Sequence, residues 1–273
     1  MLLIEAGPED KSQLIHVPIG LAAMSRSKTL NWRYESEPQA ALGNRKLFWP
    51  RGKTYGGSSS INAMVYIRGH KKDYDQWEKM GNEGWGFDKV LPYFKKSEAN
   101  QTITQDNLHG NDGPLFVDNL RTVNPLSNVF VKSGKEIGYK ENDDFNGKNQ
   151  EGVGLYQVTQ KAGERCSAAK AYLTPVLNRK NLEVISAAQV TKIMFSEKTA
   201  VGVEYVKNGN SCCAELNTGG EVLLSGGAIN SPQLLLLSGI GPASELAGHN
   251  ISAILYTQLT LPQKRRAAKQ VAG

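Results

Sequence analysis

The sequence is poor in the residue types on which several protein classes depend. Its 273 residues include only three cysteines, Cys166, Cys212 and Cys213, whose spacing fits neither a disulfide framework nor a zinc site. The adjacent pair Cys212 and Cys213 stands in a polar stretch, which indicates a hairpin rather than a redox motif. We therefore expect no metal site and no structural disulfide.

Long hydrophobic runs are also missing. No apolar stretch reaches the length that a transmembrane helix needs. The apolar start of the chain meets Glu5 at once, which differs from the pattern of a signal peptide. We expect a soluble, cytoplasmic protein, with peripheral contact to the inner membrane as the alternative.

Positive charge is in excess, but it is concentrated near one end. The chain has 32 Lys and Arg against 26 Asp and Glu, a net charge of +6. Four of the basic residues, Lys264, Arg265, Arg266 and Lys269, lie together in the last residues. Because the rest of the chain is nearly balanced, we expect no nucleic-acid partner. A basic tail that binds anionic lipid or nucleic acid is the weaker alternative.

Glycine is abundant, at 28 residues, which indicates many tight turns rather than a helical bundle. Short apolar strands alternate with helical stretches, and this order is typical of an α/β fold. We predict strands at 2–4, 114–117, 151–160, 182–185, 190–195, 200–207 and 221–225, and helices at 73–80, 88–97, 126–138, 167–177 and 231–238. Asp88 is the predicted N-cap of the second helix. The polar middle of the chain, 71–159, predicts a separate lobe.

Glu5 ends the first predicted strand. A short apolar strand that ends in an acid is typical of the second half of a dinucleotide-binding unit, where the carboxylate accepts hydrogen bonds from a ribose. The glycine-rich turn that should precede it by about 20 residues is not in this sequence. Taken alone, Glu5 is better explained as a residue at the end of a surface strand, because the motif is short.

The stretch from Arg51 to Gly69 is the most informative motif. Gly56 and Gly57 would let the backbone approach a ligand without a Cβ clash. The three serines after them offer N-caps for a helix, and N–H groups at a helix start favour anions such as a diphosphate. The simpler alternative is a polar loop that enters a helix.

A second motif runs from Gly226 to Pro242. It reads as a glycine turn followed by a helix, with Ser231 as the predicted N-cap and Pro232 at the first helical position. The leucines that follow have no polar face, which predicts a buried helix. A well-capped core helix without a ligand is the alternative.

These two motifs, in this order, resemble the two signatures of the FAD-dependent glucose–methanol–choline (GMC) oxidoreductase family. Segments 165–169, 172–175 and 181–184 are similar to the same family, and the chain is similar to bacterial choline-dehydrogenase-like alcohol dehydrogenases. The resemblance implies a Rossmann-like FAD-binding domain that lacks its first βα unit, with a partial α+β substrate-binding lobe. It divides the chain into 1–70 and 160–250 for FAD binding, 71–159 for the lobe, and a divergent basic tail, 251–273.

The resemblance also implies roles for single residues. Glu5 would hold the adenosine ribose and the backbone of Val190 would meet the adenine. The residues expected along the diphosphate are Gly56, Gly57, Ser58, Gly226 and Gly227. Those expected along the flavin ring are Asn62, Ala63, Met64 and Val65. Isoleucine stands at position 61, where some relatives carry a histidine bonded to flavin, so bound FAD would be non-covalent.

The implied reaction is the oxidation of a primary alcohol, such as choline, by hydride transfer to FAD. It needs a base for the alcohol proton, commonly histidine. His16, His70, His109 and His249 match no catalytic position of the family, and no catalytic residue is predicted. His109 is expected in a lid-like loop, His70 in an exposed loop and His249 at a helix C-terminus.

Three hypotheses follow for the chain. It is a fragment of such an oxidoreductase that is inactive alone, a part that a separate chain completes, or a non-enzymatic binding module. The first is favoured, and weak or absent FAD binding is expected because the glycine-rich diphosphate turn is not in the sequence. The substrate alcohol, the electron acceptor and the oligomeric state are left open.

Overall fold

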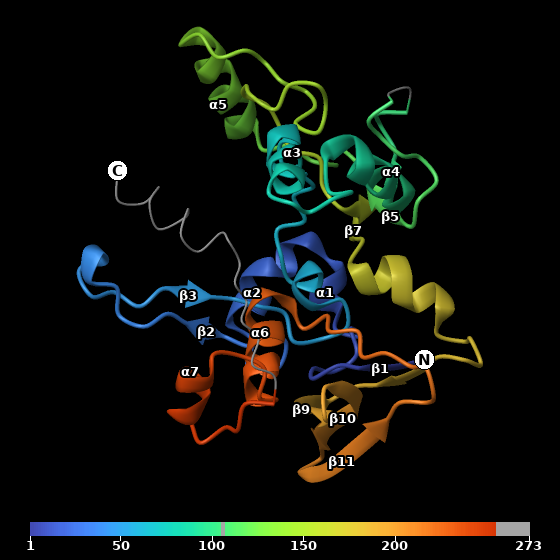
Figure 1. Ribbon diagram of the computed structural model, residues 1–273. Helices are drawn as coiled ribbons and strands as arrows, with labels where there is room; N and C mark the ends of the chain where they lie inside the picture. Colours follow the sequence, from blue (N-terminus) through green and yellow to red (C-terminus); the bar gives the residue numbers. More distant parts are fainter. Residues whose placement is uncertain (105–106, 255–273) are drawn as a thin grey trace. The chain divides into compact units, whose positions relative to one another are not determined.

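The computed structural model describes residues 1–104 and 107–254 and divides the chain into two compact units (Figure 1). Unit 1 comprises Met1–Leu3 and Gly7–Ser186, and unit 2 comprises Ile4–Ala6 and Ala187–Gly273. The predicted basic tail lies outside the described residues from position 255 onward. The separate lobe predicted over 71–159 stays a prediction.

The first elements build the hydrophobic core of unit 1. β1 (Leu2–Ile4), a correctly predicted strand, pairs with β8 (Glu183–Ile185) in a two-stranded sheet. The short helices α1 (Gln13–His16) and α2 (Leu21–Arg26) are joined by a 3-10 turn. Their apolar sides supply Ile15 and Met24, which cluster with Leu30 and Ile61 in the interior. Because Ile61 is buried in this cluster, the first signature, from Arg51 to Gly69, is packed against the core.

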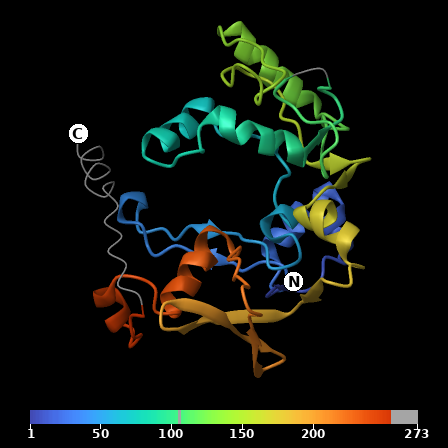
Figure 2. The ribbon, with the colours of Figure 1, turned by 45° about the vertical axis from the view of Figure 1, so that its right-hand side comes forward.

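An antiparallel ribbon follows, made by β2 (Tyr34–Glu35) and β3 (Phe48–Trp49) and closed by the 3-10 helix η2 (Ala40–Leu42) (Figure 2). The chain turns at Gly43, whose φ of 65° is left-handed. The isolated bridge between Asn31 and Gly52 continues the ribbon up to the signature.

The middle of unit 1 contains α3 (Lys71–Lys79), α4 (Phe87–Ser97) and α5 (Pro125–Glu136), and the parallel strands β4 (Glu98–Asn100) and β5 (Leu115–Val117). The three helices and β5 are confirmed predictions. Asp88, however, is not an N-cap. Gly86 precedes the helix and Asp88 lies in its first turn, because α4 already begins at Phe87, whose ring lies 6.1 Å from that of Tyr74.

The last part of unit 1 is less regular than predicted. It contains β6 (Gln160–Lys161), β7 (Glu164–Arg165), a π-helical turn η4 (Ala169–Leu173) and a 3-10 turn η5 (Thr174–Val176). The strand predicted over 151–160 is wrong except at its end. Within 151–159 the chain forms only isolated bridges, at Val153 and Val158, and an added Cβ at Gly154 would stand 1.9 Å from the Asn142 carbonyl.

Unit 2 contains an antiparallel sheet of β9 (Ala188–Ser196), β10 (Thr199–Lys207) and β11 (Asn210–Glu215), with β10 in the centre (Figure 1). The predicted strand pair is confirmed. Cys212 and Cys213 lie on β11, so the predicted hairpin is also confirmed. The strand predicted over 221–225 does not form.

Two helices, α6 (Gly227–Leu237) and α7 (Ala243–Ala247), complete the described part of unit 2. α6 begins four residues earlier than predicted, with Gly226 as its N-cap, so Ser231 and Pro232 lie inside the helix. None of its residues is fully buried, and Leu237 is 47 % exposed, which corrects the predicted buried helix. Strands and helices mix as expected for an α/β fold. In the two described stretches of the chain, we find no helix with the length and apolarity to cross a membrane.

Candidate functional site

The signature segment, residues 56–65 of unit 1, begins with two left-handed glycines. Gly56 has φ of 81° and Gly57 has φ of 54°, conformations that a side chain would strain. A 3-10 helix, η3 (Gly57–Ser60), follows and stops at Ile61. The longer helix expected here does not form, because the next residues turn away into an irregular strand-like path.

The three serines of the segment bind backbone groups around the turn instead of capping a helix. Ser59 Oγ donates to the Gly56 carbonyl (2.6 Å) and Ser60 Oγ donates to the Tyr55 carbonyl (2.6 Å). Ser58 Oγ accepts from the N–H of Gly52 (3.1 Å). These bonds hold the glycine turn in one shape.

The segment from Asn62 to Val65 is held by its own side chain and by a neighbouring loop. Asn62 Oδ1 accepts from the Met64 N–H (3.0 Å), and Met64 adopts φ of 63°, which is uncommon for a residue with a side chain. The Met64 carbonyl accepts from the Thr159 N–H (2.8 Å). Met64 is buried, whereas Asn62, Ala63 and Val65 are exposed. One face of the segment is thus available to a ligand.

The glycines test whether this segment fits a closely bound cofactor. A Cβ added to Gly56 would lie 2.5 Å from Ser60 Oγ and 3.0 Å from the Ala169 nitrogen, so Gly56 is required by internal packing. A Cβ added to Gly57 would meet no atom within 4 Å. The backbone at Gly57 is therefore open to a group such as a diphosphate, which the residues present fit.

Unit 2 holds the other predicted site residues. Glu5 is half-buried, and its carbonyl accepts from the N–H of Ala188 (3.0 Å), which places it beside the start of β9. Val190 lies two residues further along β9, paired with Tyr205. Gly226 and Gly227 begin α6, and Gly227, with φ of 87°, also has nothing within 4 Å of an added Cβ. Unit 2 thus brings Glu5 and Val190 to one end of β9.

Each unit therefore groups the site residues that it contains. Seven of them, from Gly56 to Val65, lie in the signature segment of unit 1, and Ser58 is among its exposed members. The other four, Glu5, Val190, Gly226 and Gly227, belong to unit 2. Their roles in holding a cofactor stay predictions.

A buried charged cluster in unit 1 was not foreseen. His109 is 3 % exposed, although the sequence predicted a lid-like loop for it. Its Nδ1 lies 2.8 Å from Glu98 Oε1 and its Nε2 lies 3.1 Å from Asp144 Oδ2. Arg68 forms a buried ion pair with the other oxygen of Glu98, and Asn100 Nδ2 donates to Glu98 Oε1 (2.9 Å). The cluster joins strand β4 to the loops that carry Arg68, His109 and Asp144.

The charges in this cluster stabilise one another. Burial by itself lowers the pKa of His109, but the bonds and charges of Asp144 and Glu98 outweigh it and raise that pKa to about 9. Burial raises the pKa of Glu98, but hydrogen bonds from His109 and Asn100 and the charge of Arg68 hold it below its usual value. His109 is accordingly an imidazolium at neutral pH and not a general base.

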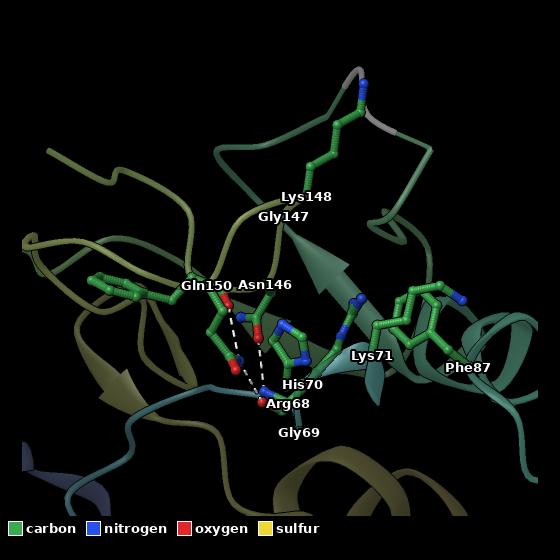
Figure 3. Close-up of a pocket in the computed structure, with 10 residues that line it drawn as sticks. Arg68, Gly69, His70, Lys71, Phe87, Asn146, Gly147, Lys148 and Gln150 are labelled. Atoms are coloured by element: carbon green, nitrogen blue, oxygen red, sulfur yellow. Dashed lines mark hydrogen bonds between the residues drawn. The ribbon is translucent and has the colours of Figure 1, made fainter. Parts of the chain in front are cut away.

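Arg68 also lines a small pocket, together with His70 and Lys71 (Figure 3). Its backbone N–H donates to Asn146 Oδ1 (2.7 Å), and Gln150 Nε2 donates to its carbonyl (2.9 Å), as the dashed lines in Figure 3 mark. The end of the first signature is thus anchored to the loop at 146–150. The sequence contained one sign of this contact: Arg68 is a cation in an otherwise apolar stretch that ends at Gly69.

The remaining histidines have structural or surface positions. His70 is the N-cap of α3, where Nδ1 accepts from the Lys72 N–H (3.1 Å). His16 lies 2.8 Å from the Asp10 carbonyl through Nε2. His249 is exposed just after α7, as predicted. No catalytic role is assigned to any of them.

Comparison with known proteins identifies a family and individual proteins to which this chain is similar. The sequence model of the GMC oxidoreductases matches residues 19–256. An alcohol dehydrogenase [acceptor] of Pseudomonas putida is 52% identical over 252 residues, which are 92% of this chain and 46% of that protein. The mitochondrial choline dehydrogenase of Homo sapiens is 45% identical over 263 residues, 94% of this chain and 44% of that protein.

Solved structures also show similarity to this chain over most of its length. Pyridoxine 4-oxidase from Mesorbium loti superposes with a TM-score of 0.87 at 32% identity, over 93% of this chain and 50% of that one. An FAD-dependent oxidoreductase from Chaetomium thermophilum superposes with a TM-score of 0.84 at 32% identity, over 92% of this chain and 45% of that one. The chain spans about half the length of the relatives that it matches.

Proposed function

Because the chain belongs to the GMC oxidoreductase family, we propose that it carries part of the FAD site of an enzyme that oxidises the CH–OH group of an alcohol. The observation that carries the proposal is the signature segment, in which a glycine turn has an open backbone face at Gly57 and is held by hydrogen bonds of three serines. Such a turn would let a diphosphate approach the backbone closely at Gly57, while the N–H of Gly57 itself donates to the Thr54 carbonyl (2.8 Å).

The residues of unit 1 would hold the diphosphate and the flavin ring. Gly57 and Ser58 offer the open turn, and the exposed side of Asn62 to Val65 offers a rigid edge for a ring. Ile61 is buried in the core and has no atom that bonds covalently to flavin, so FAD would be held without a covalent link. When bound, FAD supplies the acceptor for the hydride of the alcohol carbon.

The residues of unit 2 would hold the adenosine half. Glu5, at the end of β1, would accept hydrogen bonds from the ribose hydroxyls, and the backbone of Val190 would meet the adenine. Gly227 offers a second open backbone position for the diphosphate. We propose that 1–70 and 160–250 form the FAD-binding part, and that 71–159 belongs to the substrate lobe.

The substrate class follows from the relatives by analogy. An alcohol dehydrogenase and a choline dehydrogenase are among them, which supports a small primary alcohol of the chemical type of choline. Oxidation to the aldehyde also releases a proton. His109 is already protonated and buried, and His70 caps a helix, so we assign cofactor binding and not proton transfer to this chain.

Two matched pairs of glycine variants test the proposal. Gly57→Ala and Gly43→Ala both place a Cβ at a left-handed position of unit 1, with no atom within 4 Å. Both should cost about 1 kcal/mol of stability. Only Gly57→Ala should weaken FAD binding, by about tenfold or more, because only there would the Cβ stand between backbone and ligand.

The second pair does the same for unit 2. Gly227→Ala should weaken FAD binding, whereas Gly209→Ala, in the turn between β10 and β11 with φ of 79°, should not. The dissociation constant is measured by quenching of FAD fluorescence on titration with each protein. Equal affinity in all four variants and the parent would refute the assignment of these glycines.

A further inference from the structure

Arg165, at the end of β7, is a buried cation without a carboxylate partner. It is 1 % exposed, and among the residues that the structure describes it takes part in no ion pair. Burial lowers the pKa of its guanidinium, with no compensating charge. A buried unpaired cation is costly, so its presence at this position indicates a role that an apolar residue could not fill.

The guanidinium binds three groups, two of which belong to the signature segment. Its Nε donates to the carbonyl of Ile15 (2.8 Å), in the core helix α1. Its Nη1 donates to the carbonyl of Ser59 (3.1 Å) and to Oδ1 of Asn62 (2.9 Å). Its Nη2 is buried and has no hydrogen-bond partner. Arg165 therefore ties the signature segment to the core through a planar fork.

The bond to Asn62 has a consequence for the backbone beyond it. The same oxygen, Asn62 Oδ1, accepts from the N–H of Met64 and so supports the left-handed turn at Met64. A non-glycine residue in that conformation costs about 1 kcal/mol or more unless its surroundings hold it. Without Arg165, the Asn62 side chain would lose the contact that sets its rotamer, and the turn would lose its support.

A second contact, close to Arg165 in the sequence, also supports the signature segment. The N–H of Ala168 donates to Ser59 Oγ (2.8 Å), and an added Cβ at Gly56 would touch the backbone at Ala169. The stretch 165–169 therefore contacts the signature segment at Gly56, Ser59 and Asn62. Segments more than a hundred residues apart in the sequence thus form one rigid support.

We propose that Arg165 is a positioning residue for the cofactor: it acts through Ser59 and Asn62 to hold the signature segment in the shape that receives the flavin. The inference rests on the proposed function. Lysine cannot replace arginine here, because a single ammonium group cannot span Ile15 on one side and Ser59 with Asn62 on the other in a fixed plane.

Three variants separate positioning from general stability. Arg165→Lys keeps the charge and removes the fork. Asn62→Ala keeps Arg165 and removes the acceptor at an exposed position, where loss of folding is not expected. Arg68→Lys is the matched control, since Arg68 is also buried in unit 1 but bonds to Glu98 and Leu108 outside the signature segment.

Two quantities are measured for each variant of the 273-residue chain. Hydrogen–deuterium exchange without FAD reports the protection of the Met64 amide, and fluorescence titration gives the FAD dissociation constant. Arg165→Lys and Asn62→Ala should each speed exchange at Met64 and raise the dissociation constant by about tenfold. The loss of affinity in the double variant Arg165→Lys/Asn62→Ala should be smaller than the sum of the two single losses, because both changes remove the contact between Arg165 and Asn62.

The outcomes are distinct. An FAD affinity in Arg165→Lys equal to that of the parent overturns the inference and leaves the proposed function standing. An equal loss of affinity in Arg68→Lys also overturns it, since the effect would then be one of stability. If the parent chain shows no saturable FAD binding, the proposed function is refuted, and the inference with it.

Discussion

The buried His109 should make the stability of unit 1 depend on pH in a window where most side chains do not titrate. His109 is held between Glu98 and Asp144, and its pKa rises to about 9 from the ordinary value of 6.5. In the unfolded chain the imidazole returns to that ordinary value. The folded state therefore binds the proton more tightly than the unfolded state does.

The sign and size follow from this difference. A folded pKa above the unfolded one gives stability that is fully present below about pH 6.5 and is lost as the pH rises through about 9. The separation of the two values corresponds to about 3 kcal/mol. Because the side chain is fully buried, solvent should screen this term little. Replacement by a neutral side chain, His109→Gln, should remove it.

The assay is urea unfolding followed by tryptophan fluorescence at several pH values from 6 to 10. All four tryptophans, Trp32, Trp49, Trp77 and Trp85, belong to unit 1, so the signal reports on that unit. At pH 6 the variant should be less stable than the parent by about 3 kcal/mol, and near pH 10 the two should be similar.

The control is His249→Gln, which alters an exposed histidine of unit 2 and should leave the pH profile of unit 1 unchanged. A parent whose stability is flat between pH 6.5 and 9 would refute the reasoning. So would a His109→Gln variant that keeps the full pH dependence of the parent.

Further predictions concern single contacts. Ser238 is fully buried and its Oγ accepts from the N–H of Ile193 (2.8 Å), so Ser238→Ala should cost about 1–3 kcal/mol and speed amide exchange at Ile193; unchanged exchange would contradict the contact. A Cβ added to Gly7 would stand 1.9 Å from the Lys53 carbonyl, a backbone atom that cannot move aside. Gly7→Ala should therefore destabilise unit 1 by about 3 kcal/mol or more, against about 1 kcal/mol for Gly43→Ala, and equal losses in urea unfolding would refute the clash.

Much of the fold was predictable where local patterns decide the structure. The pairing of β9 with β10 was readable from their alternating residues, and the turn from β10 to β11 was readable from Asn208 and Gly209. The family was predictable from the two signature motifs, and the match over residues 19–256 confirms it. In both cases the informative residues lie close together in the sequence.

The start of α6 was not predictable from the usual cap signals. Serine followed by proline is a common helix start, so Ser231 was expected as the N-cap. The left-handed turn at Gly227 lets the helix begin earlier, and Pro232 therefore lies inside α6, where it removes one backbone hydrogen bond of the helix. Local preference was here overridden by the glycine turn.

The charged cluster could not be predicted from the sequence, for a different reason. Its members, Arg68, Glu98, His109 and Asp144, stand on separate loops and strands, and no periodic pattern links them. Each side chain alone reads as a surface residue. Their burial becomes intelligible only when the pairs are seen together, since each charge compensates another. The same holds for Arg165, which meets Ser59 and Asn62 only in the folded chain.

The measurement that tests the central claim most directly is an equilibrium titration of the purified 273-residue chain with FAD. The account predicts that this chain, which spans about half the length of its relatives, retains less than one FAD per chain after purification. On titration it should still bind FAD saturably at one site, and Gly57→Ala should weaken that binding while Gly43→Ala does not. The absence of saturable binding, or an equal effect of the two variants, would contradict the account.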